Sequence, residues 1–249
     1  MSINKNDLCS ALESFHGVTE IEDKVKKLDC LSMEFEIIAK VVLFGGCFEI
    51  NGIRRIYPLE IEFYYHEEKE DGLKDPVMYH TSDHENNKHL PYFPLGALNC
   101  HVSGIDVTFE NKDKEYRASF LIRKYKVCEY ENGKWEVKKD KEREERSTYI
   151  YEDMFMNISL FDGINIRWVS AESVNPPQEV NVKPRINVAE YEMDDNGKYI
   201  KTDGQYKKVE ITKDEYNKLS DSEKKEYFKY SKKIIKKCRR EWNYSVEQD

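Results

Sequence analysis

Residues 59–65 read Leu-Glu-Ile-Glu-Phe-Tyr-Tyr, and their alternation constrains the fold more than any other feature of the chain. A β-strand sends successive side chains to opposite faces, so this segment is predicted to be a strand with two unlike faces. One face carries Ile61, Phe63 and Tyr65, and the other carries Glu60, Glu62 and Tyr64. Buried carboxylates are rare unless they are paired or functional, so the two glutamates either face solvent on an edge strand or belong to a site.

Several further elements surround this strand. Apolar residues recur at three- to four-residue steps over 22–43, which predicts an amphipathic helix that ends at Gly45. Asn51 and Gly52 form the dipeptide most typical of a tight hairpin, so a strand is expected on each side of them. The remaining predicted strands are 105–110, 116–127, 184–191 and 239–244. Strands dominate the first half of the chain and helices are interspersed, which indicates the α+β class rather than a doubly wound sheet.

The length of 249 residues fits a single domain, and we expect one over 1–249. Residues 192–238 read as an insertion within it. A turn signal at 195–197 predicts a hairpin. Thr212 with Glu215, and Ser220 with Glu223, have the spacing of capping boxes, so two consecutive helices are expected to follow.

Composition narrows the classes of function. No run of about 18 apolar residues is present and the first ten residues are polar, so we expect a cytoplasmic chain with no membrane association. The six cysteines are isolated in the sequence, which favours reduced, mostly buried thiols over a zinc or redox motif. The net charge of −8 opposes binding to nucleic acid, so any such function requires a locally basic face.

Short motifs occur in an order that resembles one known family. They are Leu-Phe-Gly at 43–45, Glu-Ile-Glu-Phe-Tyr at 60–64, a histidine at 80, Gly-Ala-Leu at 96–98 and Phe-Leu-Ile-Arg at 120–123. This order resembles the alkylpurine (3-methyladenine) DNA glycosylases found in vertebrates and many bacteria. The segments 183–188 and 238–244 are similar to the two C-terminal strands of that family. The resemblance covers roughly 35–125 and 183–245, and no single motif in it is specific.

The resemblance implies a role for five side chains. Glu62 matches the glutamate that activates the attacking water, and Arg123 matches an arginine that helps to hold this water. Tyr64 matches an aromatic residue that stacks on the flipped base, and His80 matches a histidine on the other side of the base. His101 takes the place of a second stacking residue, with a one-residue gap in the alignment.

The implied protein is a monofunctional DNA glycosylase of base excision repair, with a mostly antiparallel, curved sheet flanked by helices. A base inside a duplex cannot be reached, so it is rotated out and read by stacking and hydrogen bonds. A carboxylate can stabilise the positive charge that develops on the sugar and can take a proton from water. The resemblance therefore implies a monomer that acts on duplex DNA with a modified base and needs no cofactor and no metal.

Two departures from the family leave alternatives open. Ser103 and Gly104 stand where the family has a Tyr-Gly pair whose tyrosine fills the gap left by the flipped base. Tyr92 or Phe93 could fill that gap instead, or the substrate differs. A non-catalytic binding or interaction module on the same fold is the second hypothesis. A metal-dependent hydrolase that uses the histidines of residues 66–95 is the third.

Charge is the other departure. Residues 221–240 contain nine basic and three acidic residues, a local net charge of +6. This run is either the solvated face of a helix or part of a phosphate-binding face. In the second case it would lie beside Arg185, Arg117, Lys124 and Lys126, which are the predicted DNA contacts.

Overall fold

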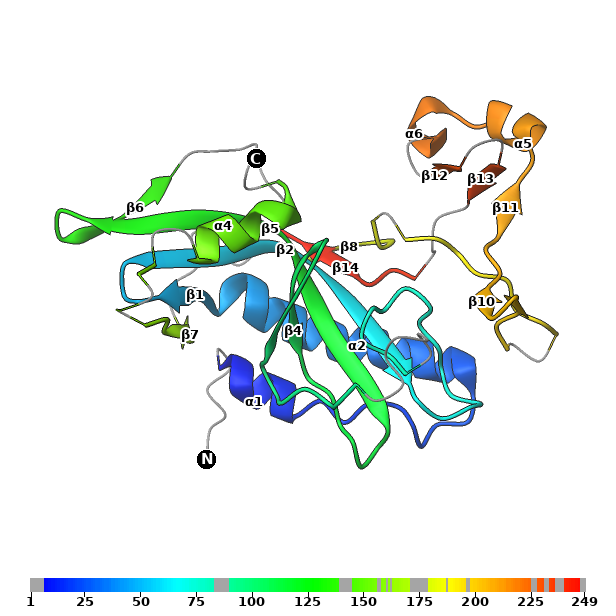
Figure 1. Cartoon of the computed structure of the whole chain (residues 1–249), viewed down its shortest axis with the longest axis horizontal. Coiled ribbons are helices and arrows are strands. Elements are labelled where there is room, and N and C mark those ends of the chain that lie inside the picture. The colour runs from blue at the N-terminus through cyan, green and yellow to red at the C-terminus, as the bar shows by residue number, and fades with distance from the viewer. Residues whose placement is uncertain are drawn as a thin grey trace.

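A computed structural model of the chain describes residues 7–82, 90–138, 145–155, 158–159, 161, 163–170, 179–186, 188–195, 198–224, 228–230, 233–235 and 240–246. Over these residues the chain is α+β, with an open nine-stranded sheet and few helices (Figure 1). The strands are β1 (Gly46–Ile50), β2 (Arg54–Glu67), β3 (Leu98–His101), β4 (Gly104–Thr108), β5 (Tyr116–Glu131), β6 (Lys134–Lys138), β7 (Ile166–Ser170), β8 (Asn181–Lys183) and β14 (Asn243–Ser245). The predicted class is thus confirmed.

The sheet is built around its two longest strands. Its main path runs β3-β4-β5-β2-β1-β7, while β14 pairs with β2 and β8, and β6 pairs with β5. Every pairing recorded among the described strands of this sheet is antiparallel. Because β2 has β5 on one side and β1 and β14 on the other, it is a central strand.

The helix predicted at 22–43 is present as α2 (Lys24–Phe44). The Asp23 carboxylate accepts hydrogen bonds from two backbone N–H groups of its first turn, and Gly45 caps its end. Phe35 of this helix stacks on Phe63 of β2, with ring centroids 4.3 Å apart. This contact places the core between α2 and one face of the sheet (Figure 1). The other helical elements are α1 (Leu8–Glu13), η2 (Ser147–Tyr149), α4 (Ile150–Phe155), α5 (Lys213–Asn217) and α6 (Asp221–Lys224).

The hairpin predicted at Asn51 and Gly52 joins β1 to β2. The Ile53 N–H donates to the Ile50 carbonyl at 3.0 Å, and the two central residues of this turn, Asn51 and Gly52, have positive φ, 50° and 69°, as a type I′ turn requires. A Cβ atom added at Gly52 would meet no other atom within 4 Å, so only the backbone conformation restricts the residue there. A substitution at Gly52 therefore measures the free-energy cost of a left-handed backbone conformation without a steric clash.

We expect Gly52→Ala to lower the free energy of unfolding by about 1 kcal/mol, because alanine pays a steric cost in the left-handed region. Gly52→Asn should cost less, since asparagine tolerates this region better. Urea denaturation of the two variants and the wild type measures the difference. Equal stability of the alanine variant and the wild type would contradict this account of the turn.

The two faces of β2 are arranged as the alternation predicted. Ile61, Phe63 and Tyr65 have no exposed surface and belong to the core. Glu60 and Glu62 on the opposite face are also buried, with 1% and 0% of their surface exposed. The alternative in which they face solvent on an edge strand is wrong, because β2 is flanked by strands on both sides.

The predicted strand at 184–191 is wrong. Strand β8 ends at Lys183, residues 184–186 lie outside any strand, and Ala189 and Tyr191 form only isolated bridges, while residue 187 lies outside the described part of the chain. The physical reason is that the backbone of Ile186 bonds to side chains: its N–H donates to Glu62 and its carbonyl accepts from Arg123. The closing strand, predicted at 239–244, is present as β14, displaced toward the C-terminus.

The segment predicted as an insertion has its own small elements. Backbone hydrogen bonds join Asp194 to Lys198 and Ile200 to Glu192, as in the expected hairpin, and residues 196–197 of its turn lie outside the described residues. Strand β9 (Lys201–Thr202) pairs with β10 (Gln205–Tyr206). Both helices are present as α5 and α6, and the capping box of Thr212 and Glu215 is formed. The sequence did not predict the three-stranded sheet of β11 (Glu210–Ile211), β12 (Phe228–Tyr230) and β13 (Lys233–Ile235). Whether the segment is an insertion stays a prediction.

Two expectations from composition can be compared with the described residues. No helix in this part of the chain is long and apolar enough to cross a membrane. The five described cysteines are free, but only Cys47 and Cys128 are buried, so the expectation of mostly buried thiols is wrong.

Candidate functional site

The carboxylate of Glu62 is the centre of the candidate site. Its Oε1 accepts hydrogen bonds from the Tyr64 hydroxyl at 2.5 Å and from Arg123 Nη2 at 2.6 Å. Its Oε2 accepts from the Ile186 N–H at 2.6 Å and from Asn243 Nδ2 at 3.3 Å. A carboxylate has about four lone-pair positions, so these four donors occupy all of them.

An irregularity between β2 and β5 directs Arg123 toward Glu62. The cross-strand register shifts around Glu60, where Glu60 faces Lys124 and Ile61 faces Ile122. Arg123 therefore has no partner in the register, and its side chain reaches Glu62 instead. Irregularities of this kind commonly re-aim a side chain beside a functional site. No local pattern in the sequence marks this shift.

The electrostatics of the cluster are mutually reinforcing. Burial lowers the pKa of Arg123, but Glu62, Tyr64 and Glu60 together raise it more, so the guanidinium stays charged. Burial and the charge of Glu62 together raise the pKa of Tyr64 well above its ordinary value. Tyr64 therefore remains protonated and donates its hydroxyl hydrogen to Glu62.

Glu60 occupies a separate place on the same face. Asn243 Nδ2 lies between the two glutamates, 2.9 Å from Glu60 Oε1 and 3.3 Å from Glu62 Oε2. The other oxygen of Glu60 is 3.1 Å from Lys183 Nζ and 3.8 Å from Lys124 Nζ. Lys124 keeps 35% of its side chain exposed, so it remains accessible as a predicted DNA contact.

Arg185 does not have the position of a phosphate contact. It is 1% exposed, and its guanidinium binds Asp75 at 2.6 and 3.1 Å. It also lies 5.0 Å from the ring of Tyr64 and 5.3 Å from that of Trp242. The prediction that Arg185 contacts DNA from a surface is wrong, because its charge is buried and engaged behind Tyr64.

Arg117 is buried in the same way. It is 2% exposed and binds the carboxylates of Glu68 and Glu110 together with the backbone carbonyls of Leu90 and Pro91. Two carboxylates and two carbonyl oxygens leave this guanidinium with no face toward solvent. The prediction that Arg117 contacts DNA is therefore also wrong.

The two predicted base-binding histidines form pairs with buried carboxylates. His80 Nε2 lies 3.1 Å from Glu110 Oε1, and His101 Nε2 lies 3.1 Å from Asp106 Oδ1. Tyr79, which is half exposed, packs on His101 with ring centroids 5.1 Å apart. No group of three or more His, Cys, Asp or Glu residues that could hold a metal ion is found in the described part of the chain. Two of the histidines considered as ligands, His84 and His89, lie outside it.

A cavity of about 540 Å³ lies directly beside the Glu62 cluster. Arg123 and Tyr64 line it, whereas Glu62 lies behind them and the two predicted histidines are not among the lining residues. Among the described residues, the charged ones that line it are Arg123 and Lys208, and both are basic. Tyrosine and hydroxyl side chains supply most of the remaining polar lining, namely Tyr64, Tyr79, Tyr191, Ser103, Ser147 and Thr148.

No family model, curated protein or solved structure matches this chain. The family resemblance of the motifs therefore rests on the residues themselves. The site is likewise interpreted from its own geometry.

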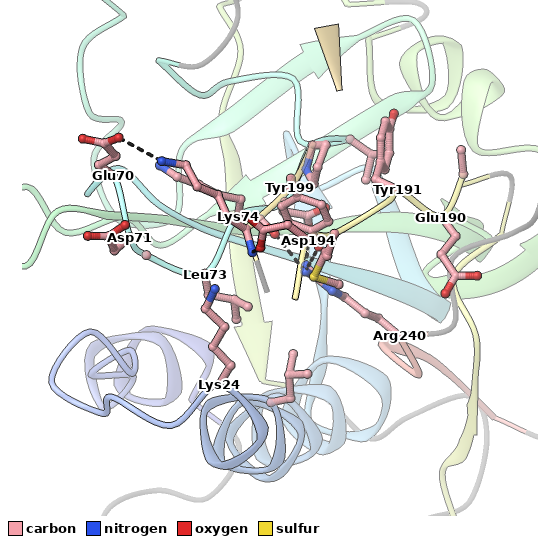
Figure 2. A pocket seen from close by; sticks show the side chains of 18 of the residues that line it. Lys24, Glu70, Asp71, Leu73, Lys74, Glu190, Tyr191, Asp194, Tyr199 and Arg240 are labelled. Atoms are coloured by element: carbon pink, nitrogen blue, oxygen red, sulfur yellow. Dashed lines mark hydrogen bonds and ion pairs between the residues drawn. The ribbon is translucent and has the colours of Figure 1, made fainter. Parts of the chain in front are cut away.

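A second cavity, of about 660 Å³, shares the lining residues Pro76, Val77, Ala189 and Tyr191 with the first. Figure 2 shows the side chains that line this second cavity. Arg240 at its wall donates to the Lys74 carbonyl and to the Tyr199 hydroxyl, and Lys198 pairs with Glu70 at 2.9 Å (Figure 2). Its lining contains equal numbers of acidic and basic residues, so its charge selects no ligand class.

Several residues of the site were missed by sequence reasoning. Asn243 reaches Glu62 because β14 pairs with β2 in a register that sets these two residues opposite each other. Asp75 lies in an irregular loop with no pattern around it, and Ile186 contributes only backbone groups. The position of Tyr79 in the cavity wall depends on the fold, and no local pattern in the sequence marks it.

Proposed function

We propose that this protein is a DNA glycosylase-like hydrolase that takes a damaged or modified base, rotated out of duplex DNA, into the 540 Å³ cavity. The observation that carries the proposal is the Glu62–Arg123 pair, 2.6 Å apart, whose arginine lines that cavity together with the ring of Tyr64. A buried carboxylate can activate a water molecule and an aromatic wall can stack on a flipped base, so this arrangement suits base excision.

Each group has a definite part in the reaction. The ring of Tyr64 stacks on the base, a contact worth about 1–3 kcal/mol. The bond between base and sugar breaks with its electron pair leaving on the base, a water molecule forms the new bond to the sugar carbon, and Glu62 takes the proton of this water. A cationic alkylated base leaves as a neutral molecule, whereas a neutral base takes up the proton that Glu62 then holds. Arg123 orients the water beside Glu62. The water takes the place of the Tyr64 hydroxyl at Oε1, since Tyr64 occupies that position in this structure.

The charge around the cavity supports an anionic partner in spite of the net charge of −8. Arg123 and Lys208 are its charged lining residues. Lys124 and Lys183 lie near Glu60 at the adjoining strands, with 35% and 39% of their side chains exposed. Such lysines are suited to phosphate contacts, which position a duplex without reading its sequence.

A second candidate is a non-catalytic module that binds the same base. The complete set of four donors around Glu62 favours it, because no lone pair of the carboxylate is left for a water molecule. In this alternative Glu62 holds the site together and Tyr64 with Tyr79 provides the binding surface.

The test uses the purified chain and duplex DNA with alkylated purines or other modified bases. Free base is detected by mass spectrometry, and binding is followed in parallel by fluorescence anisotropy. The hydrolase predicts release of one base without strand cleavage. Preferential binding with no release would support the module instead, and no preference for any modified duplex would contradict both.

A further inference from the structure

The side-chain amide of Asn243 joins the two buried carboxylates of β2. Strand β14 pairs with β2 so that Asn243 stands opposite Glu62, and Asn243 has no exposed surface. Its Nδ2 atom lies 2.9 Å from Glu60 Oε1 and 3.3 Å from Glu62 Oε2. Because one nitrogen is within hydrogen-bond distance of both oxygens, the two carboxylates are close neighbours in a site that excludes solvent.

This amide determines which protonation state of the two glutamates is favoured. Two neighbouring carboxyl groups often share one proton, because their charges repel each other. The nitrogen of an amide carries two hydrogens and accepts none, so it pairs only with carboxylate oxygens that are free of a proton. The Asn243 Oδ1 atom is buried and has no hydrogen-bond partner among the described residues, so the contact with the glutamates leaves this carbonyl unsatisfied.

Each glutamate also has a cation on the oxygen that faces away from the amide. Arg123 Nη2 lies 2.6 Å from Glu62 Oε1. Lys183 Nζ and Lys124 Nζ lie 3.1 Å and 3.8 Å from Glu60 Oε2. Two further ionisable side chains of the described part of the chain lie around the pair, and neither is negatively charged: Tyr64, which donates to Glu62, and Arg185 behind its ring. Both carboxylates can therefore be ionised at the same time.

The two oxygens of Glu62 have different parts in this arrangement. Its Oε2 is held by the amide of Asn243 and by the Ile186 N–H, and these two contacts fix the rotation of the carboxylate. Its Oε1 faces Arg123 and Tyr64, which both line the 540 Å³ cavity. Asn243 provides the one side-chain contact of Oε2, since Ile186 bonds through its backbone.

We infer that Asn243 is a positioning residue of the proposed hydrolysis: its amide keeps Glu62 ionised beside Glu60 and turns Glu62 Oε1 toward the cavity. This inference rests on the proposed function and adds a residue to the same site. Asn243 touches neither the base nor the water, so it acts through Glu62.

The first test is the pH profile of single-turnover base release between about pH 4 and about pH 8. Asn243→Asp keeps the shape of the side chain but adds a third carboxyl group, which retains a proton in the cluster. We expect the acid limb of the profile to move to higher pH by at least about one unit, so the variant loses at least about tenfold more rate at the acid end than at the alkaline end. A merely structural role would lower the rate by the same factor at every pH.

Two further variants accompany this measurement. Asn243→Ala removes the donor without adding a charge and should move the acid limb in the same direction. Ser245→Ala is the matched control, because Ser245 lies on the same face of β14, opposite Glu60, and is also buried. It should keep the profile of the wild type.

The second test needs no DNA. The ¹³C signals of the Glu60 and Glu62 carboxyl groups, assigned with Glu60→Gln and Glu62→Gln, are followed over the same pH range in the full chain. In the wild type we expect both groups to be ionised at neutral pH. In Asn243→Asp the cluster should hold a proton up to a pH at least about one unit higher than in the wild type.

The outcomes separate this inference from the function on which it rests. An acid limb and carboxyl titrations that stay at their wild-type positions in both Asn243 variants would overturn the inference and leave the glycosylase proposal standing. Shifted carboxyl titrations with no base release from any duplex would support the part of Asn243 in keeping Glu62 ionised and overturn the hydrolytic proposal.

Discussion

Glu62→Gln is expected to slow base release by about 10²–10⁴-fold, the usual contribution of a positioned general base. Glutamine has nearly the shape of glutamate but cannot take a proton from water. The effect is measured as the single-turnover rate of base release, with the modified duplex from which the wild type releases base fastest. Retention of the wild-type rate by this variant would remove Glu62 from the mechanism.

The same substitution disturbs the hydrogen bonds of the site. Each oxygen of Glu62 accepts hydrogen bonds from two donors. The NH₂ group of glutamine is itself a donor, so it faces other donors whichever of the two oxygen positions it takes. We expect the free energy of unfolding to fall by about 1–3 kcal/mol. Glu60→Gln is the matched control, because Glu60 is buried on the same strand face but binds Asn243, Lys183 and Lys124 rather than the cavity-lining Tyr64 and Arg123. It should lose comparable stability and keep its release rate within about tenfold of the wild type, so a loss of folding and a loss of chemistry can be told apart.

Asp75→Ala is expected to lower the free energy of unfolding by about 3–5 kcal/mol, the usual result of removing one partner of a buried ion pair. Asp75 has no exposed surface and binds Arg185 at 2.6 Å, while Arg240 Nη1 lies 3.8 Å away. Its loss leaves a buried guanidinium without its carboxylate. Urea denaturation measures the change. Asp71→Ala is the control, since Asp71 and Asp75 both line the 660 Å³ cavity but Asp71 is exposed. It should change the free energy of unfolding by no more than about 0.5 kcal/mol.

The pH dependence of this effect has a definite sign. Burial raises the pKa of Asp75, but Arg185 and Arg240 lower it more, so its pKa in the folded protein is below the ordinary value. Its contribution to stability is complete above the unfolded value of about 3.9 and is lost as the pH falls through the lower folded value. The difference between the wild type and Asp75→Ala should therefore shrink below about pH 4. A difference that grows as the pH falls would contradict the ion pair.

Local features of this chain could be predicted from its sequence. The steps of apolar residues predicted α2, the Asn51-Gly52 pair predicted the first hairpin, and alternation predicted which side chains of β2 face the core. Each of these depends on residues within one or two turns of helix or a few strand positions. Such short-range patterns reflect backbone geometry and burial, which the neighbouring residues largely determine.

The candidate site is formed by residues that are far apart in the sequence, and only some of their contacts could be predicted. Glu62, Tyr64 and Arg123 were grouped through the family resemblance, and the structure brings these three together. Arg117 and Arg185 were expected to contact DNA beside the basic run 221–240, but carboxylates far away in the sequence, Glu68 and Asp75, bind them. The strand predicted at 184–191 failed for the same reason, since its backbone bonds to Glu62 and Arg123.

The sequence by itself determined the α+β class, the central helix and the division of β2 into an apolar and a polar face. Only the tertiary structure decided that the polar face is buried, that Arg123 turns toward Glu62 and that a cavity opens beside them. Glu62 and Ile186 are 124 positions apart, and Asp75 and Arg185 are 110 apart. Periodicity reports where a side chain points from its own backbone, whereas the fold of the whole chain sets which distant group it meets.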